Sequence, residues 1–213
     1  MNVLIIDYGS GNLRSVAKAI ERGVRDAGLS LTVQVSANPE DLREASHIIL
    51  PGVGAFGDCR AGLLALDGMV NALDEAVLIT AKPFLGICVG MQLMGTLGLE
   101  HGKHAGLGWL KGTVRALEFN NQNLKIPHMG WNELVVNTFH PVLDGLNNRP
   151  HVYFVHSYYM DCDSPADVLA TVNYGGPITA VVGCDNMIGT QFHPEKSQEV
   201  GLKLIRNFLK WKP

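Results

Sequence analysis

Cysteine is scarce in this sequence, and no two cysteines form a C-x-x-C pair. The four cysteines, Cys59, Cys88, Cys162 and Cys184, are scattered along the 213 residues. Their spacing favours neither a zinc site nor a thioredoxin-like dithiol. We therefore expect reduced thiols and no bound metal.

The chain also lacks long apolar runs and blocks of basic residues. No stretch approaches the roughly 18 consecutive apolar residues of a membrane span, and the opening MNVLIIDYGS lacks the basic start of a secretory signal. Lys and Arg together number 17 against 20 Asp and Glu, so a nucleic-acid ligand is not expected. These absences predict a soluble protein of the reducing cytoplasm, with no membrane partner.

No linker rich in Pro, Gly or Ser divides the sequence, and 46% of its residues are hydrophobic. A chain of this length can bury one full core, so we expect a single domain over residues 1–213. Its first half alternates helical patterns, including a helix over 58–79 and one after Cys88, with apolar runs at 2–6, 31–35, 47–52 and 83–87. This alternation is typical of a parallel sheet with helices on both faces.

From about residue 106 the pattern changes to short strand-like runs separated by Gly, Asn and Pro. Such runs occur at 112–117, 132–136, 151–159, 168–174, 179–183 and 187–192, and they favour antiparallel pairing. Residues 198–211 predict a closing helix. The sequence as a whole predicts a mixed α/β fold.

Three glycine-rich turns follow predicted strands of the first half, where ligands gather in an open parallel sheet. The first, Gly9-Ser10-Gly11, begins like a dinucleotide-binding motif, but Arg14 occupies the position of the third glycine. We therefore interpret it as a tight strand-to-helix turn.

The segment GICVG at 86–90 has the form of a nucleophile elbow, in which small residues allow a sharp turn from strand to helix. Such a turn would present the Cys88 side chain above the sheet, beside a helix N-terminus that favours a thiolate. It would also aim the Val89 backbone N–H at an oxyanion. For this motif alone, a buried structural cysteine is the alternative.

The segment TQFHPEKS at 190–197 supplies a candidate base. His193 and Glu195 are two residues apart, so on an extended segment their side chains share one face; a surface pair is the simpler alternative. A cysteine nucleophile requires a base, and the base requires a carboxylate that holds its tautomer. The turn Gly52-Val53-Gly54 is either a second oxyanion donor or an ordinary strand-to-helix turn.

The motifs PGVGAFG, GICVGMQ and FHPE, in this order, resemble those of the class I (triad) glutamine amidotransferases. Within that class, DYGSGNLRSV, PHMGWN, YFVHSYY and HPEKS resemble the glutaminase subunits of imidazole glycerol phosphate synthases. The resemblance implies one flavodoxin-like α/β domain and a catalytic triad of Cys88, His193 and Glu195. It also implies an oxyanion hole formed by Val89 and the segment Gly52, Val53 and Gly54.

The activity implied is hydrolysis of L-glutamine to glutamate and ammonia through a Cys88 thioester, without a cofactor. The ammonia would pass to a (β/α)8-barrel synthase subunit, the partner in a heterodimer, which makes imidazole glycerol phosphate and AICAR in histidine biosynthesis. The family commonly has Ser before the glutamate that corresponds to Glu100, where this chain has Leu99. Carried over at matching positions, the glutamine contacts are Gln92, Glu100, His156, Ser157 and Tyr158.

In the same family the residues that face the synthase correspond to Asn12, Trp131, Tyr153 and Lys196. Simpler alternatives are core packing for Trp131, a core histidine for His156 and a solvent-facing or capping Gln92. Two rival enzymes are the glutaminase of a pyridoxal phosphate synthase, against which HMGWN and HPEKS argue, and a cysteine peptidase or γ-glutamyl hydrolase with an open cleft. The non-enzymatic rival is a binding protein with a relic elbow, but all three types of triad residue are retained.

Overall fold

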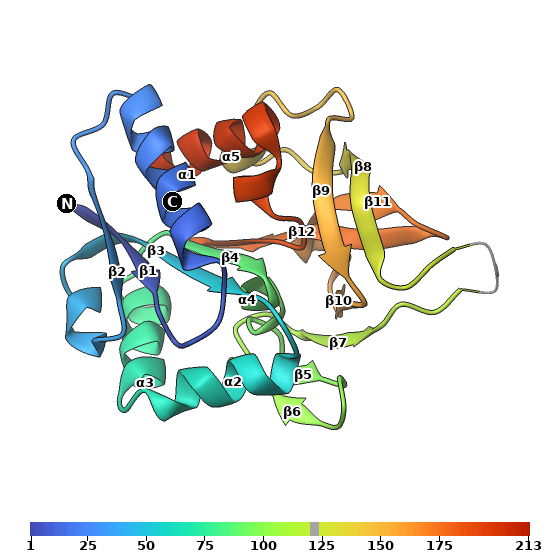
Figure 1. The fold of residues 1–213 in the computed structure, drawn as a ribbon, viewed down its shortest axis with the longest axis horizontal. Helices are drawn as coiled ribbons and strands as arrows, with labels where there is room; N and C mark the ends of the chain where they lie inside the picture. The colour runs from blue at the N-terminus through green and yellow to red at the C-terminus, as the bar shows by residue number, and fades with distance from the viewer. Residues whose placement is uncertain (120–123) are drawn as a thin grey trace.

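The computed structural model describes residues 1–119 and 124–213. A nine-stranded sheet crosses the molecule in the order β2-β1-β3-β4-β13-β12-β11-β8-β9 (Figure 1). Its first five strands are parallel: β2 (Thr32–Ser36), β1 (Asn2–Ile6), β3 (Ala45–Gly52), β4 (Phe84–Cys88) and β13 (Met187–Thr190). This order is that of flavodoxin-like sheets, so the predicted fold class is confirmed.

The second half of the chain continues the same sheet with antiparallel strands. These are β12 (Pro177–Cys184), β11 (Val168–Asn173), β8 (His128–Val136) and β9 (His151–His156). A smaller sheet joins β10 (Tyr158–Cys162), β7 (Gly112–Ala116), β5 (Leu97–Gly98) and β6 (His104–Ala105). The predicted antiparallel pairing is therefore present, but in two sheets.

The predicted strand over 151–159 was wrong as one element. His156 ends β9 in register with His128 of β8, whereas Tyr158 begins β10 in register with Ala116 of β7. Ser157 lies at the step between the two sheets, where its carbonyl accepts a hydrogen bond from the Leu117 N–H at 2.8 Å. The run 151–159 is therefore divided because its two parts pair with different strands, β8 and β7.

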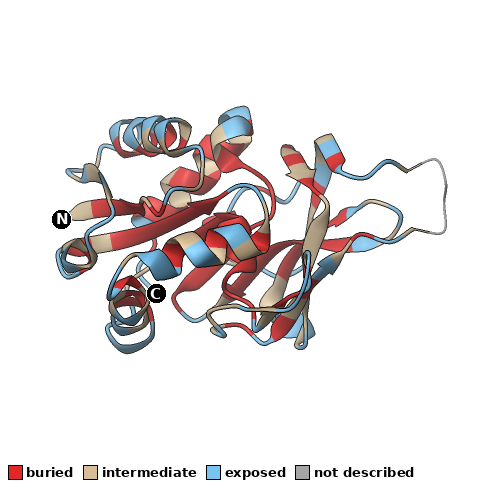
Figure 2. Cartoon of the chain, turned by 60° about the horizontal axis from the view of Figure 1, so that its bottom comes forward, coloured by how far each residue is buried: buried red, intermediate tan, exposed pale blue. Residues whose placement is uncertain are grey.

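Helices cover both faces of the parallel strands (Figure 1). On one face α1 (Leu13–Asp26) packs against α5 (Gln198–Lys210); the other carries α2 (Phe56–Ala65) and α3 (Met69–Asp74). Figure 2 shows buried residues along the sheet and exposed ones on the outer helix surfaces. The short helices are η1 (Pro39–Leu42), η2 (Glu75–Ile79), η3 (Pro141–Leu143), η4 (Pro165–Asp167) and η5 (Pro194–Lys196).

The helix predicted over 58–79 was also wrong, because the segment is divided into α2, α3 and η2. Leu66 is extended, with ψ 104°, and Gly68 caps α3 in the left-handed region at φ 74°. Glycine enters that region without a Cβ clash, so a break there costs little. Among the described residues, none of the helices has the length and apolar character needed to cross a membrane.

Candidate active site

Cys88 lies on a sharp turn between β4 and α4 (Val89–Gln92). Its backbone angles are φ 55° and ψ −112°, a conformation that non-glycine residues rarely adopt and that concentrates at functional sites. A Cβ at Gly90 would lie 1.8 Å from the Leu50 carbonyl oxygen, and one at Gly86 would lie 2.7 Å from the Gly90 oxygen. The two glycines thus let α4 pack directly on β3 and β4.

Substituting Gly90 with alanine should lower the melting temperature strongly, because the new methyl group would clash with backbone. Overpacking in a close-packed interior costs about 1–3 kcal/mol or more. Gly57→Ala is the matched control, since its Cβ would meet the ring of His104, a side chain that can turn away. Thermal unfolding of both variants checks this, and equal melting temperatures would contradict it.

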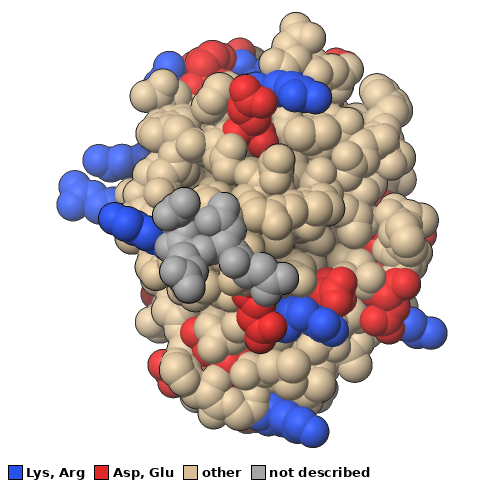
Figure 3. Space-filling model, turned by 90° about the vertical axis from the view of Figure 1, so that its right-hand side faces the viewer, with Lys and Arg blue, Asp and Glu red and all other residues tan. Residues whose placement is uncertain are grey.

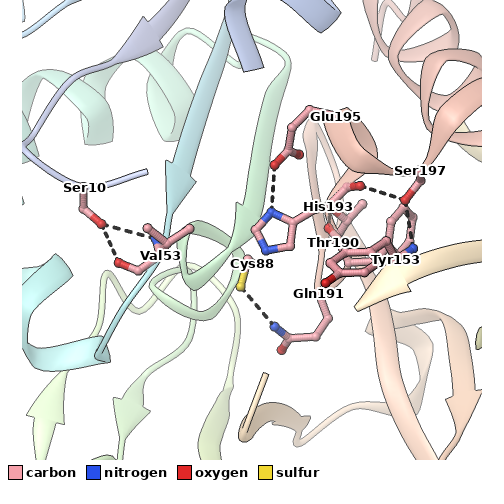
Figure 4. A network of polar contacts seen from close by, with 10 residues as sticks. Ser10, Val53, Cys88, Tyr153, Thr190, Gln191, His193, Glu195 and Ser197 are labelled. Atoms are coloured by element: carbon pink, nitrogen blue, oxygen red, sulfur yellow. Dashed lines mark hydrogen bonds and ion pairs between the residues drawn. The ribbon is translucent and has the colours of Figure 1, made fainter. Parts of the chain in front are cut away.

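His193 and Glu195 follow β13, the strand that lies beside β4. His193 Nδ1 is 2.8 Å from Glu195 Oε1, and the two side chains are 2% and 1% exposed. A carboxylate accepts, so Nδ1 carries the hydrogen, and Nε2 faces Cys88 (Figure 4). Among the described residues Nε2 has no hydrogen-bond partner, which leaves it free to exchange a proton with a group above Cys88.

The charge state of His193 follows from its neighbours. Burial disfavours the imidazolium, but the Cys88 and Glu195 side chains outweigh burial and raise the pKa of His193 to about 9. This raised pKa favours the protonated ring at neutral pH, in which Nε2 carries a hydrogen toward Cys88 that it can give to a leaving group.

The backbone of His193 is held from β9 and from the start of α5. Its N–H donates to the Tyr153 carbonyl at 3.0 Å. The buried Ser197 hydroxyl donates to the His193 carbonyl at 2.7 Å and accepts from the Tyr153 N–H at 3.0 Å (Figure 4). A movement of β9 would thus be transmitted to the imidazole.

A cavity of about 230 Å³ opens beside Cys88. Glu100 lines it, and its Oε2 accepts a hydrogen bond from the Phe56 N–H at 2.7 Å. Gln92 uses both amide hydrogens within the protein, to the Tyr158 carbonyl at 3.1 Å and to Gln191 Oε1 at 3.0 Å, so its own oxygen is left for a ligand. All five predicted glutamine contacts line this cavity, together with Gly54 and Val89: Gln92, Glu100, His156, Ser157 and Tyr158.

Ser10, interpreted from the sequence only as part of a tight turn, contacts the predicted oxyanion segment. Its hydroxyl donates to the Val53 carbonyl at 2.7 Å and accepts from the Val53 N–H at 3.2 Å (Figure 4). Gly52 pairs with Cys88 across β3 and β4, and Gly54 has φ 98°. The N–H of Val53 is therefore occupied by Ser10, on the side away from Cys88.

Sequence interpretation also missed Gln191, whose Nε2 lies 3.7 Å from the Cys88 sulfur. A signal was present, because Gln191, His193 and Glu195 alternate along the segment and alternate residues of an extended chain share a face. Ser10 offered a weaker signal, since its partner Val53 is 43 residues away.

Three of the four predicted interface residues lie together. The rings of Trp131 and Tyr153 meet edge to face at 5.9 Å between centroids, and Lys196 Nζ lies 5.9 Å from the Tyr153 ring. Asn12 lies at the start of α1, exposed, two residues after Ser10. Trp131 is 46% exposed, so core packing does not account for it.

Comparisons with known proteins agree with this geometry. Residues 4–211 match the family described as glutamine amidotransferase class-I. The chain is 56% identical to the imidazole glycerol phosphate synthase subunit HisH of Rhodospirillum rubrum and 55% identical to those of Brucella suis and Agrobacterium fabrum, with 100% of each chain covered. A solved glutamine amidotransferase shares the fold at a TM-score of 0.73 and 20% identity, with 97% of both chains covered. On these grounds the chain belongs to the class-I glutamine amidotransferases.

Proposed function

We propose that this protein is the glutaminase subunit of an imidazole glycerol phosphate synthase, which hydrolyses L-glutamine and delivers ammonia to a (β/α)8-barrel synthase subunit. The observation that carries the proposal is the placement of Cys88 on a strained turn facing the paired His193 and Glu195. Identity of about 55% to HisH subunits over the full chain supports the choice of synthase.

In the proposed reaction the Cys88 thiolate attacks the side-chain carboxamide of glutamine, and the carbonyl π electrons move onto oxygen. The Val89 N–H and the segment Gly52–Gly54 would stabilise that oxyanion. His193 gives its proton to the departing nitrogen, so ammonia leaves and a thioester remains. His193 then takes a proton from water as the water attacks the thioester, and collapse releases glutamate and the thiolate.

The cavity suits the free amino acid. The Glu100 carboxylate and the Gln92 oxygen would bind the α-ammonium group, and the stretch His156-Ser157-Tyr158 would bind the α-carboxylate. The cavity of about 230 Å³ has room for free glutamine, and the full-length identity to HisH subunits argues against a peptidase. No step requires a cofactor or metal, and we propose the cytoplasm as its compartment because a free thiol persists where the environment is reducing.

The proposed docking face for the synthase carries Trp131, Tyr153 and Lys196. It belongs to the side of the molecule that holds β8 and β9 (Figure 1), and Figure 3 shows that side with charged side chains of both signs scattered among larger uncharged areas. Met129, the next outward residue of β8, is 62% exposed. Exposed apolar residues with a polar rim are typical of a protein interface.

Coupling to the synthase would act on the segment Gly52–Gly54. Ser10 holds the Val53 N–H in the resting chain, so one oxyanion donor is withheld. Rotation of that peptide would release it, and contacts relayed from Trp131 and Lys196 would favour the rotated state, as in other two-state switches. Loss of one oxyanion donor typically costs about 10²–10³-fold in kcat.

The experiment that tests the function measures glutamate release by the chain alone, with the barrel synthase subunit, and with that subunit and its nucleotide ligand. We expect little release alone and successive increases of about 10²-fold overall. Release that never rises with the partner would contradict the coupling, and absence of glutamate release in all three conditions would refute the function.

In the same assay, Ser10→Ala should raise glutamate release by the isolated chain about tenfold. A hydrogen bond contributes about 0.5–1.5 kcal/mol net, and this variant loses both contacts with Val53. Ser46→Ala is the control, because Ser46 bonds the Asn2 carbonyl at 2.8 Å, away from Cys88. Unchanged release by the Ser10 variant would remove Ser10 from the switch.

A further inference from the structure

We propose that Gln191 is a hydrogen-bond donor that holds the Cys88 sulfur for attack. Its donor side is fixed through Gln92 by the Tyr158 carbonyl, and a second branch of hydrogen bonds from Asn132 on β8 holds that carbonyl in place. The inference deepens the proposed function, on which it rests, because it concerns the nucleophile of that reaction. Gln191 is fully buried, and Figure 4 shows its amide below the Cys88 sulfur with the His193 ring above it.

The orientation of the Gln191 amide follows from the Tyr158 carbonyl. A carbonyl oxygen can only accept, so the Gln92 group that lies 3.1 Å from it must be the NH₂. The second hydrogen of that NH₂ donates to Gln191 Oε1 at 3.0 Å. The other end of the Gln191 amide, the NH₂, therefore faces the Cys88 sulfur at 3.7 Å, a distance suited to an N–H donor and a large sulfur acceptor.

A second branch meets the same carbonyl. His156 Nδ1 lies 2.9 Å from the Tyr158 oxygen and must donate to it, which leaves Nε2 of a neutral His156 as an acceptor. His128 Nδ1 lies 2.9 Å from that Nε2 and donates to it. Burial lowers the pKa of both histidines to about 4, in agreement with two neutral rings at neutral pH.

Asn132, at the other end of this branch, is oriented by contacts that do not involve the Tyr158 carbonyl. Asn132 Oδ1 accepts from the Glu133 N–H at 2.8 Å, and Asn132 Nδ2 donates to the Asn173 carbonyl at 3.1 Å. Nδ2 is also 3.2 Å from His128 Nε2, which a neutral His128 offers as an acceptor. Backbone groups at both ends thus require the same tautomers, and every junction pairs one donor with one acceptor.

This arrangement gives the sulfur a hydrogen-bond partner, the Gln191 amide, beside the His193 imidazole whose Nε2 faces it. The amide favours the thiolate, since a hydrogen bond to a charged group is stronger than one to a neutral group. It also limits the rotation of the Cys88 side chain. Gln191 touches the reacting atom, whereas His128, His156 and Gln92 are positioning residues for this role.

The first test replaces Gln191 with methionine, which keeps its length and removes the donor, and with glutamate, which keeps an acceptor for Gln92. Alkylation of Cys88 by iodoacetamide is followed by mass spectrometry across pH in the isolated chain, with thermal unfolding as the folding check. We expect the midpoint of the pH profile to move up by about one pH unit or more in each folded variant. A wild-type midpoint in either folded variant overturns the assignment of Gln191.

The second test separates the relay from packing at His128, whose ring stacks on Phe154 at 4.7 Å and on Tyr174 at 4.0 Å. His128→Phe keeps an aromatic ring and loses the donor, whereas His128→Asn keeps a donor near the Nδ1 position and loses the stacking. We expect the alkylation midpoint to rise in the phenylalanine variant and to be restored in the asparagine variant. The reverse order would overturn the relay.

The two proposals fail separately in these measurements. Alkylation needs neither glutamine nor the synthase subunit, so a shifted midpoint supports the role of Gln191 even if the wild-type protein releases no glutamate. In the complete complex, loss of Gln191 should lower kcat about tenfold or more with KM for glutamine changed little. A rise in KM with unchanged kcat would instead place Gln191 in substrate binding and overturn its role at the sulfur.

Discussion

Cys88→Ala should reduce glutamine hydrolysis by this protein on the order of 10⁶-fold, the loss that follows removal of the nucleophile from a catalytic triad. No thioester can form without the sulfur, and His193 and Gln191 then face a methyl group. The fold should persist, because alanine is smaller and meets the same backbone angles, φ 55° and ψ −112°, that cysteine tolerates there.

Glutamate release in the complex with the synthase subunit and the mass of the acyl-enzyme during turnover measure this effect. Cys184→Ala is the control, since Cys184 is a free cysteine at the end of β12. Substantial glutamate release by a pure, folded Cys88 variant would remove the central mechanistic proposal.

His193→Ala and Glu195→Gln should differ in the size of their effects. The first removes proton transfer at both steps and should cost about 10²–10⁴-fold or more, whereas the second leaves the base in place with a weaker hold on its tautomer. In a serine protease triad, removal of the orienting carboxylate lowers kcat about 10²-fold less than removal of the base does. We expect the same order here, because Glu195 contacts the Nδ1 side and not the reacting side of the ring.

Single-turnover glutamate formation distinguishes the two variants, and His151→Ala on the exposed start of β9 serves as control. The carboxylate also supports the imidazolium, so Glu195→Gln should lower the pKa of His193 from its raised position of about 9. A Glu195 variant slower than the His193 variant would reverse the assigned roles. A wild-type rate in the His193 variant would exclude His193 as the base.

Much of the parallel half was predictable because local pattern and tertiary environment agree there. The five residues of β4 are all buried, and an unbroken apolar run is what a doubly covered strand requires. The stripe of α1 likewise buries Val16, Ile20 and Val24. The elbow was predictable because a side chain at Gly86 would clash with the backbone of Gly90 in the same turn, which is a local property of the sequence.

The remainder depends on contacts between distant segments. The strand that pairs with the second edge of β4 is β13, which comes from the far end of the chain. Nothing within MIGTQF predicts that this strand has a parallel neighbour on one side and an antiparallel neighbour on the other. The contact of Ser10 with Val53 and the contact of Gln191 with Cys88 join residues 43 and 103 positions apart. Hydrogen bonds of that kind have no local signature.

The late position of β13 also sets the order in which the site is completed during synthesis. A growing chain makes Cys88 and its turn first, whereas β13, His193 and Glu195 emerge much later. Until then β4 has β3 on one side and an unpaired edge on the other, and its thiol has no base. A chain that still lacks β13 therefore cannot hydrolyse glutamine. β13, which joins the parallel and antiparallel parts of the sheet, is followed directly by the residues that complete the site.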